Sequence, residues 1–198
     1  MLERALKMDQ EMFLWLNSLG SESWDWFWLF ITRQFNWVPL FAIILYLLIK
    51  HLGWRHVILI CVLVAALLTI TDQSTNLVKH FFQRARPVNN PEFEGLMRIV
   101  QSRKSYSFFS GHASNSMAGA MFLFLILRPY IKYMGFIFIW PFIFAYSRIY
   151  LGLHYPSDII CGYGWGALMA LLMWQAYRKL RDHFFPKQKG MLDNPGNI

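Results

Sequence analysis

The chain has 198 residues, of which 56% are hydrophobic and only 15% are charged, and its formal net charge is +8. This composition excludes an ordinary soluble domain and predicts an integral membrane protein. Most of the cations lie at the ends of apolar segments, where positive charge orients membrane proteins, so the expected partner is a lipid bilayer and not a nucleic acid. Cys61 and Cys161 lie within apolar segments and are interpreted as packing residues.

Residues 2–17 mix apolar side chains with charges, which is typical of an amphipathic helix at the membrane surface and unlike a cleavable signal. Apolar helices are then expected over residues 24–32, 37–49, from 57 onward, 113–127, 131–145 and 159–174. The first of these is short for a membrane span and contains Asp25. In the last helix, glycine or alanine recurs at four-residue intervals and predicts close helix packing, at Gly162, Gly166 and Ala170.

The charges of the loops predict the orientation of these helices. Basic clusters at residues 50–56, 128–132 and 178–189 alternate with the other loops, so the positive-inside rule places them in the cytoplasm. Both termini then lie in the cytoplasm, and the expected fold is an all-α bundle of six transmembrane helices behind the N-terminal interfacial helix. The loop after residue 87 and the stretch around His154 share the periplasmic side of a bacterial inner membrane.

We expect one membrane-embedded domain over residues 1–189 and a mobile tail over residues 190–198. No internal repeat or second domain is apparent in the sequence, and the sequence makes no prediction of oligomeric state.

Polar side chains interrupt the third apolar helix at spacings of four, three, four and three residues, at Asp72, Asn76, Lys79, Gln83 and Arg86. These spacings place all five on one helical face, and ionisable groups in a membrane helix usually face a cavity. Pro87 is expected to end the helix at Arg86. Arg84 is off this face and is interpreted as snorkelling toward the interface.

A second polar cluster follows a 22-residue external stretch that ends in Phe109-Ser110-Gly111-His112. Ser110 is a suitable N-cap, and Gly111 allows the backbone to approach a ligand, so the exposed amides of this turn favour an anion. The alternative for His112 is a helix-end histidine that is bonded only to water.

A third cluster runs from Ser147-Arg148 to His154 and Asp158, between two long apolar segments. Pro156 suits the first position of a helix, so Asp158 lies in its first turn and can reach back to the His154 ring. Such a carboxylate fixes the tautomer and leaves the other ring nitrogen free to attack. The alternative is a membrane-interface loop with a capping Asp, a snorkelling Arg and a surface His.

Together the clusters offer three cations, Lys79, Arg86 and Arg148, with only one or two carboxylates. That balance repels a divalent metal and suits a phosphate dianion. The sequence therefore predicts phosphate chemistry without a metal or other cofactor.

The three clusters resemble the motifs of the type 2 phosphatidic acid phosphatases, a family related to the vanadium haloperoxidases and glucose-6-phosphatase. The motifs are Lys79, six residues, Arg86-Pro87; then Ser110-Gly111-His112; then Ser147-Arg148, five residues, His154, three residues, Asp158. Phe109 stands where the family usually has proline, and the resemblance covers roughly residues 37–180.

The resemblance implies a role for each residue. His154 would be the nucleophile that forms a phosphohistidine, and Asp158 would orient its ring. His112 would protonate the leaving oxygen and then activate water. The phosphate oxygens would be held by Lys79, Arg86, Arg148 and the Ser110-Gly111 turn.

The leading hypothesis is a lipid phosphatase acting on phosphatidic acid, phosphatidylglycerol phosphate or an isoprenoid diphosphate such as undecaprenyl diphosphate. Contacts from Arg98, Arg103 and Lys104 to a second phosphate would favour the diphosphate, although these are equally explained as solvated charges or contacts to anionic headgroups. A lipid phosphotransferase would use the same residues. A non-catalytic lipid-binding or scramblase-like protein is disfavoured because both histidines are present.

Overall fold

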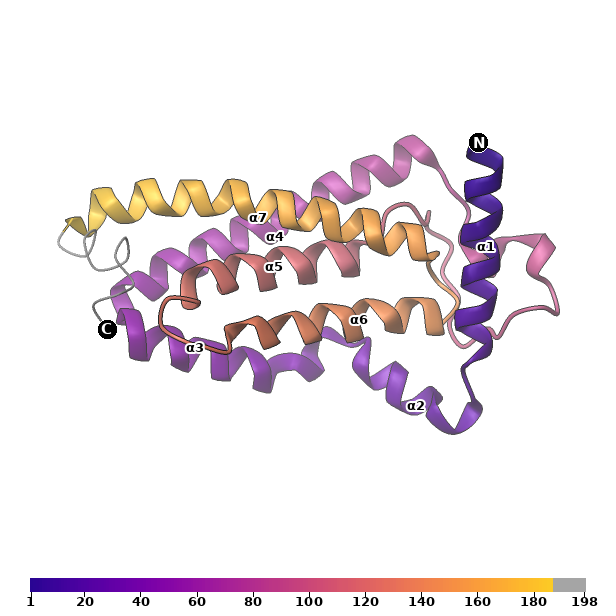
Figure 1. Ribbon diagram of the computed structural model, residues 1–198, viewed down its shortest axis with the longest axis horizontal. Helices are drawn as coiled ribbons and strands as arrows, with labels where there is room; N and C mark the ends of the chain where they lie inside the picture. Colours follow the sequence, from indigo (N-terminus) through magenta and orange to yellow (C-terminus); the bar gives the residue numbers. More distant parts are fainter. Residues whose placement is uncertain (187–198) are drawn as a thin grey trace.

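The structure is a computed structural model that describes residues 1–186 (Figure 1). Its regular elements are α1 (Leu2–Ser18), α2 (Glu22–Ile31), η1 (Gln34–Trp37), α3 (Val38–Leu52), α4 (Trp54–Phe82), η2 (Pro87–Asn89), η3 (Pro91–Phe93), α5 (Gly111–Leu127), η4 (Met134–Phe138), α6 (Ile139–Tyr150) and α7 (Pro156–Phe184). Every regular element within residues 1–186 is helical, which confirms the all-α prediction. The expected mobile tail, residues 190–198, lies outside the described residues.

Among residues 1–186, three helical stretches are long and apolar enough to cross a membrane, Gln34–Leu52, Trp54–Phe93 and Pro156–Phe184, and two shorter apolar stretches accompany them, Gly111–Leu127 and Met134–Tyr150. Large apolar side chains such as Ile43, Val62 and Leu172 are exposed on the outside of the bundle. Contiguous apolar surface of this kind is suited to contact with lipid. The fold is therefore that of an integral membrane helical bundle.

Helices α3 to α7 run along the length of the bundle, and α1 lies across one end of it (Figure 1). The buried ring of Phe13 attaches α1 there, with its centroid 5.7 Å from that of Phe93 and 5.6 Å from that of Tyr155. The buried Asn17 side chain donates hydrogen bonds to the carbonyl oxygens of Ile149 and Tyr150 at 3.3 and 3.0 Å. The crosswise position of α1 agrees with the predicted interfacial helix.

The small residues of α7 allow it to approach α5 closely. A Cβ atom at Gly162 would lie 2.8 Å from the Ser110 carbonyl oxygen, and one at Gly166 would overlap the Ser114 carbonyl oxygen. This confirms the packing predicted from the four-residue intervals. The contact also brings the first turns of α5 and α7 together, and the Ser110 amide donates to the Asp158 carbonyl oxygen at 3.0 Å.

The three basic loops lie together at the end of the bundle opposite α1: the α3–α4 turn, the α5–α6 connection and the end of α7 (Figure 1). Ring contacts join these segments, with centroids of His51 and Tyr130 5.4 Å apart and those of His56 and Phe185 3.7 Å apart. The grouping predicted from loop charge is therefore correct for the described residues.

The short helix α2 bears on the predicted number of spans. It has only ten residues, about 15 Å of rise, and runs in the same direction as α3, so within the described residues it is not among the helices long enough to cross a ~30 Å hydrocarbon core. The N-terminus consequently lies at the α1 end of the bundle and Phe184 at the opposite end (Figure 1). Both termini were expected on the cytoplasmic side from the loop charges, and the short segment was counted as a span because that arrangement requires an even number of spans.

Candidate active site

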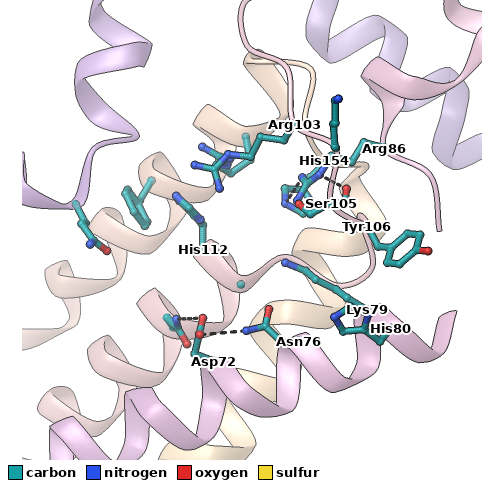
Figure 2. A pocket seen from close by; sticks show the side chains of 16 residues that line it. Asp72, Asn76, Lys79, His80, Arg86, Arg103, Ser105, Tyr106, His112 and His154 are labelled. Atoms are coloured by element: carbon teal, nitrogen blue, oxygen red, sulfur yellow. Dashed lines mark hydrogen bonds between the residues drawn. The ribbon is translucent and has the colours of Figure 1, made fainter. Parts of the chain in front are cut away.

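At the α1 end of the bundle, a cavity of about 620 Å³ opens among α4, α5, α6 and the loops between them. The cationic and imidazole side chains that line it are Lys79, His80, Arg86, Arg103, Lys104, His112, Arg148 and His154. Figure 2 shows several of these side chains reaching into the cavity from different elements. The structure thus joins residues from all three sequence motifs in one site.

The ring of His154 is almost fully buried and is held at both nitrogens. Its Nε2 lies 2.9 Å from Arg86 Nη1, and its Nδ1 lies 3.2 Å from Asp158 Oδ2. Since the guanidinium can only donate, Nε2 accepts and the ring proton is on Nδ1, toward the carboxylate. Burial, followed by the charges of Arg86 and Arg148, lowers the pKa of His154 well below its ordinary value. The imidazole is therefore neutral, with its unprotonated nitrogen on the cationic side.

Asp158 is fully buried and has hydrogen bonds on both carboxylate oxygens. Its Oδ2 accepts from the Tyr155 amide at 2.9 Å and from the Ser107 hydroxyl, besides facing His154. Its Oδ1 accepts from Arg84 Nη1 at 2.8 Å. These bonds fix the carboxylate against the imidazole, as predicted for this pair.

Arg84 holds this carboxylate and was misinterpreted as a snorkelling cation. Its Nη2 pairs with Asp9 of α1 at 2.7 Å, and its guanidinium carbon lies 3.9 Å from the Tyr155 ring centroid. Asp9 in turn accepts from the Ser157 amide at 2.8 Å. Arg84 therefore joins the N-terminal helix to the carboxylate beside His154.

The position of Arg86 differs from the prediction. Helix α4 ends at Phe82, and Gln83 caps it in a left-handed conformation with its side chain exposed. Arg86 therefore reaches the cavity from the following loop and not from the helical face of Lys79. Its guanidinium donates to the carbonyl oxygens of Ser105 and Leu153, both at 2.7 Å.

Lys79 and Arg148 complete the cationic wall. The Lys79 ammonium forms no hydrogen bond or ion pair with another residue of the described range and lies 3.8 Å from where a Cβ of Gly111 would be. Arg148 Nη1 donates to Thr32 Oγ1 at 2.5 Å, while its buried Nε has no partner among residues 1–186. Thr32 had no motif to mark it, because its contact comes from a distant segment.

The first turn of α5 forms as predicted, with the Ser110 hydroxyl accepting from the Ala113 amide at 3.4 Å. Ser110 is fully buried beside α7 and is not part of the cavity wall, whereas Gly111 and His112 are. The His112 ring stacks on Phe144 with centroids 4.9 Å apart. His112 therefore faces the same cavity as His154.

The three residues predicted as possible headgroup contacts, Arg98, Arg103 and Lys104, do not all lie at the cavity. Arg103 and Lys104 line the cavity. Arg98 instead donates from Nη2 to both carboxylate oxygens of Asp25, at 2.9 and 3.0 Å, away from the cavity wall. Its charge is thus used in joining α2 to the loop. Within residues 1–186, no group of three or more His, Cys, Asp or Glu side chains is placed to hold a metal.

The bundle brings a buried His–Asp pair beside clustered cations, an arrangement typical of a membrane protein that binds phosphate. Residues 55–182 match the model of the PAP2 superfamily. The chain belongs to this family. It is 38% identical over 170 residues to a lipid A 4′-phosphatase of Bacteroides thetaiotaomicron, a match that covers 82% of this chain and 73% of that protein.

Two further proteins are similar to this chain. A lipid A 4′-phosphatase of Porphyromonas gingivalis is 29% identical over 188 residues, covering 92% of this chain and 78% of that one. The crystal structure of a PAP2-type phosphatidylglycerolphosphate phosphatase from Bacillus subtilis has a TM-score of 0.68 at 18% identity, with 89% of this chain and 87% of that chain covered. The family match and these similarities identify the chain as a membrane phosphatase.

Proposed function

We propose that this chain hydrolyses the terminal phosphate of a membrane lipid through a covalent phosphohistidine at His154. The observation that carries the proposal is the state of that ring: Nδ1 faces the Asp158 carboxylate, and the unprotonated Nε2 faces the cationic cavity. A neutral imidazole with its proton fixed on the far nitrogen is a competent nucleophile.

In the first step, Nε2 of His154 forms a bond to phosphorus while the bond from phosphorus to the lipid oxygen breaks. The leaving oxygen takes a proton from the His112 imidazolium. In the second step, water attacks the same phosphorus and gives its proton to His112. The bond from phosphorus to Nε2 breaks, which releases inorganic phosphate and restores both histidines.

The cations act on the charge that develops on the phosphoryl oxygens. Arg86 already donates toward Nε2, so an entering phosphate takes over that donor and frees the nitrogen lone pair. Lys79, Arg148 and the Gly111 amide complete the set, and fixed donors of this kind stabilise the transition state without reorganisation. Ser110 supports this turn from behind. The charge is supplied by side chains, and the reaction is expected to need no metal.

For the lipid itself, the similarity to two lipid A 4′-phosphatases supports a lipid A-type phosphate over the diphosphate carrier that contacts from Arg98, Arg103 and Lys104 would favour. We assign the active site to the periplasmic side, because the basic loops gather at the opposite end of the bundle. Phosphatidic acid, phosphatidylglycerol phosphate and undecaprenyl diphosphate remain the substrates to compare against.

The test is a phosphate-release panel on the detergent-solubilised chain with these four lipids, in EDTA. We expect release from the lipid A-type phosphate, and loss of at least a thousandfold in His154→Ala with the fold retained by circular dichroism. Full activity of His154→Ala, or a strict need for an added divalent cation, would end the proposal. Transfer of labelled phosphate to a lipid hydroxyl without free phosphate would assign a phosphotransferase instead.

A further inference from the structure

A second cavity of about 630 Å³ adjoins the catalytic one and is lined by the α2–α3 connection and the loop before α5. Gln34, Arg103, His112 and Arg148 line both cavities. We call the second cavity the headgroup lobe. Because these four side chains belong to both walls, the two cavities lie side by side.

His154 lines only the catalytic cavity, whereas His112 lines both. In a phosphoryl transfer, the attacking and leaving atoms lie roughly in line on opposite sides of phosphorus. A phosphate attacked by His154 therefore directs its leaving oxygen toward His112. The part of the lipid attached to that oxygen then extends past His112 into the headgroup lobe.

The lobe presents polar groups that have no partner within residues 1–186. The buried Oε1 of Gln101 accepts no hydrogen bond from the described residues. The exposed side chain of Gln34 also lines the lobe. A buried acceptor without a donor is costly, so a ligand that offers a donor is favoured there. Phe35, 78% exposed, adds a flat apolar ring at the edge of the lobe.

These groups distinguish among lipid phosphates. A hydroxyl both donates and accepts, so a hydroxyl-rich headgroup satisfies the Gln101 oxygen and the Gln34 amide together. The ester carbonyls of diacylglycerol and the fully ionised phosphate of an isoprenoid monophosphate can only accept hydrogen bonds, so they leave the buried Gln101 oxygen without a donor. A sugar also has an apolar C–H face of a size that packs on Phe35.

We propose that the headgroup lobe binds the saccharide of a glycolipid phosphate, with Gln34 and Gln101 as specificity-determining residues. The inference rests on the proposed function, since it assigns the leaving group of that reaction. It makes the sugar, and not the acyl chains, the part of the lipid that the site distinguishes.

The test compares Gln101→Met and Gln34→Met with the parent chain on two substrates in the same detergent, lipid A carrying the 4′-phosphate and phosphatidic acid. Each change removes hydrogen-bonding atoms and keeps the length of the side chain. We expect kcat/KM on the sugar lipid to fall about tenfold, and by at least fivefold more than on phosphatidic acid. The matched control is Gln175→Met, an exposed position in the half of α7 that lies away from the site. It should leave kcat/KM on both lipids unchanged.

Equal losses on both lipids, or no loss on either, would overturn the lobe assignment while the phosphatase activity stands. Parent activity on phosphatidic acid but not on the sugar lipid would overturn it in the same way. Absence of phosphate release from both lipids would instead refute the proposed function.

Discussion

At the scale of single residues, a chain of polar contacts leading from Asp158 to Asp9 fixes the proton of His154 on Nδ1. Asp158 faces Nδ1, Arg84 holds the other carboxylate oxygen, and Asp9 holds Arg84. A buried carboxylate is stable in its charged form only when cations or hydrogen-bond donors compensate it. Arg84 is therefore expected to act on the reaction through Asp158, as a positioning residue.

Arg84→Gln should lower kcat about a hundredfold and change KM little, because a displaced Asp158 misorients the nucleophile. Arg84→Lys should recover only part of the rate, since an ammonium cannot bridge two carboxylates as a guanidinium does. Steady-state kinetics on one lipid phosphate measures both. Arg178→Gln, exposed at the far end of α7, serves as the control. A wild-type kcat in Arg84→Gln would contradict the positioning role.

The pH dependence follows from the lowered pKa of His154, which arises from burial and then from Arg86 and Arg148. A lowered pKa keeps the imidazole neutral, and so reactive, to more acidic pH. The acidic limb of kcat/KM, corrected for the separately measured ionisation of the substrate phosphate, should therefore lie below the ordinary value of 6.5. A limb at or above 6.5 would mean that the ring is charged in the free enzyme.

At the scale of elements, two contacts place the reactive groups. Helix α7 packs directly on the backbone of α5, which brings the turn of His112 beside that of Asp158. Helix α1 lies across the site end, where Asp9 accepts from both the amide and the hydroxyl of Ser157, at 2.8 and 2.5 Å. The interfacial helix is thus part of the support of the carboxylate beside His154.

Gly166→Ala should destabilise the bundle by about 1–3 kcal/mol, because the added methyl group meets the Ser114 carbonyl and nearby α5 backbone. Gly164→Ala, on the same helix with nothing within 4 Å of the new atom, should be neutral or slightly stabilising. Thermal unfolding in detergent compares them. Similar melting temperatures for the two variants would show that α5 and α7 are not packed as described.

At the scale of the whole molecule, the sequence predicts what depends on spacing and composition. The motif spacings identify His112, His154 and Asp158, and the loop charges correctly group the three basic connections at one end. The supporting residues Thr32 and Ser107 are not predictable in this way, because they reach the site from distant segments. Arg84 does carry a signal: residues two apart in an extended segment share a side, and it lies two positions before Arg86.

The number of spans depends on a different argument. Residues 24–32 are counted as a span because loop charges place both termini on one side, which requires an even number of spans, whereas the ten residues of α2 rise only about 15 Å. The prediction that Arg86 shares a helical face with Lys79 also requires α4 to continue to Pro87. The helix instead ends at Phe82, with Gln83 as its C-cap.

The central claim is the covalent step on His154, and a phosphoenzyme trap tests it most directly. The His112→Asn variant, incubated with a phosphate ester of an acidic phenol whose leaving oxygen needs no proton, labelled in its phosphoryl group and quenched in alkali, should retain label on the protein. The label should be released by acid, as a phosphorus–nitrogen bond is, and should be absent from the His112→Asn/His154→Gln double variant. Label that persists in the double variant, or turnover of this ester by the His112→Asn variant without any labelled protein, would contradict a phosphohistidine at His154.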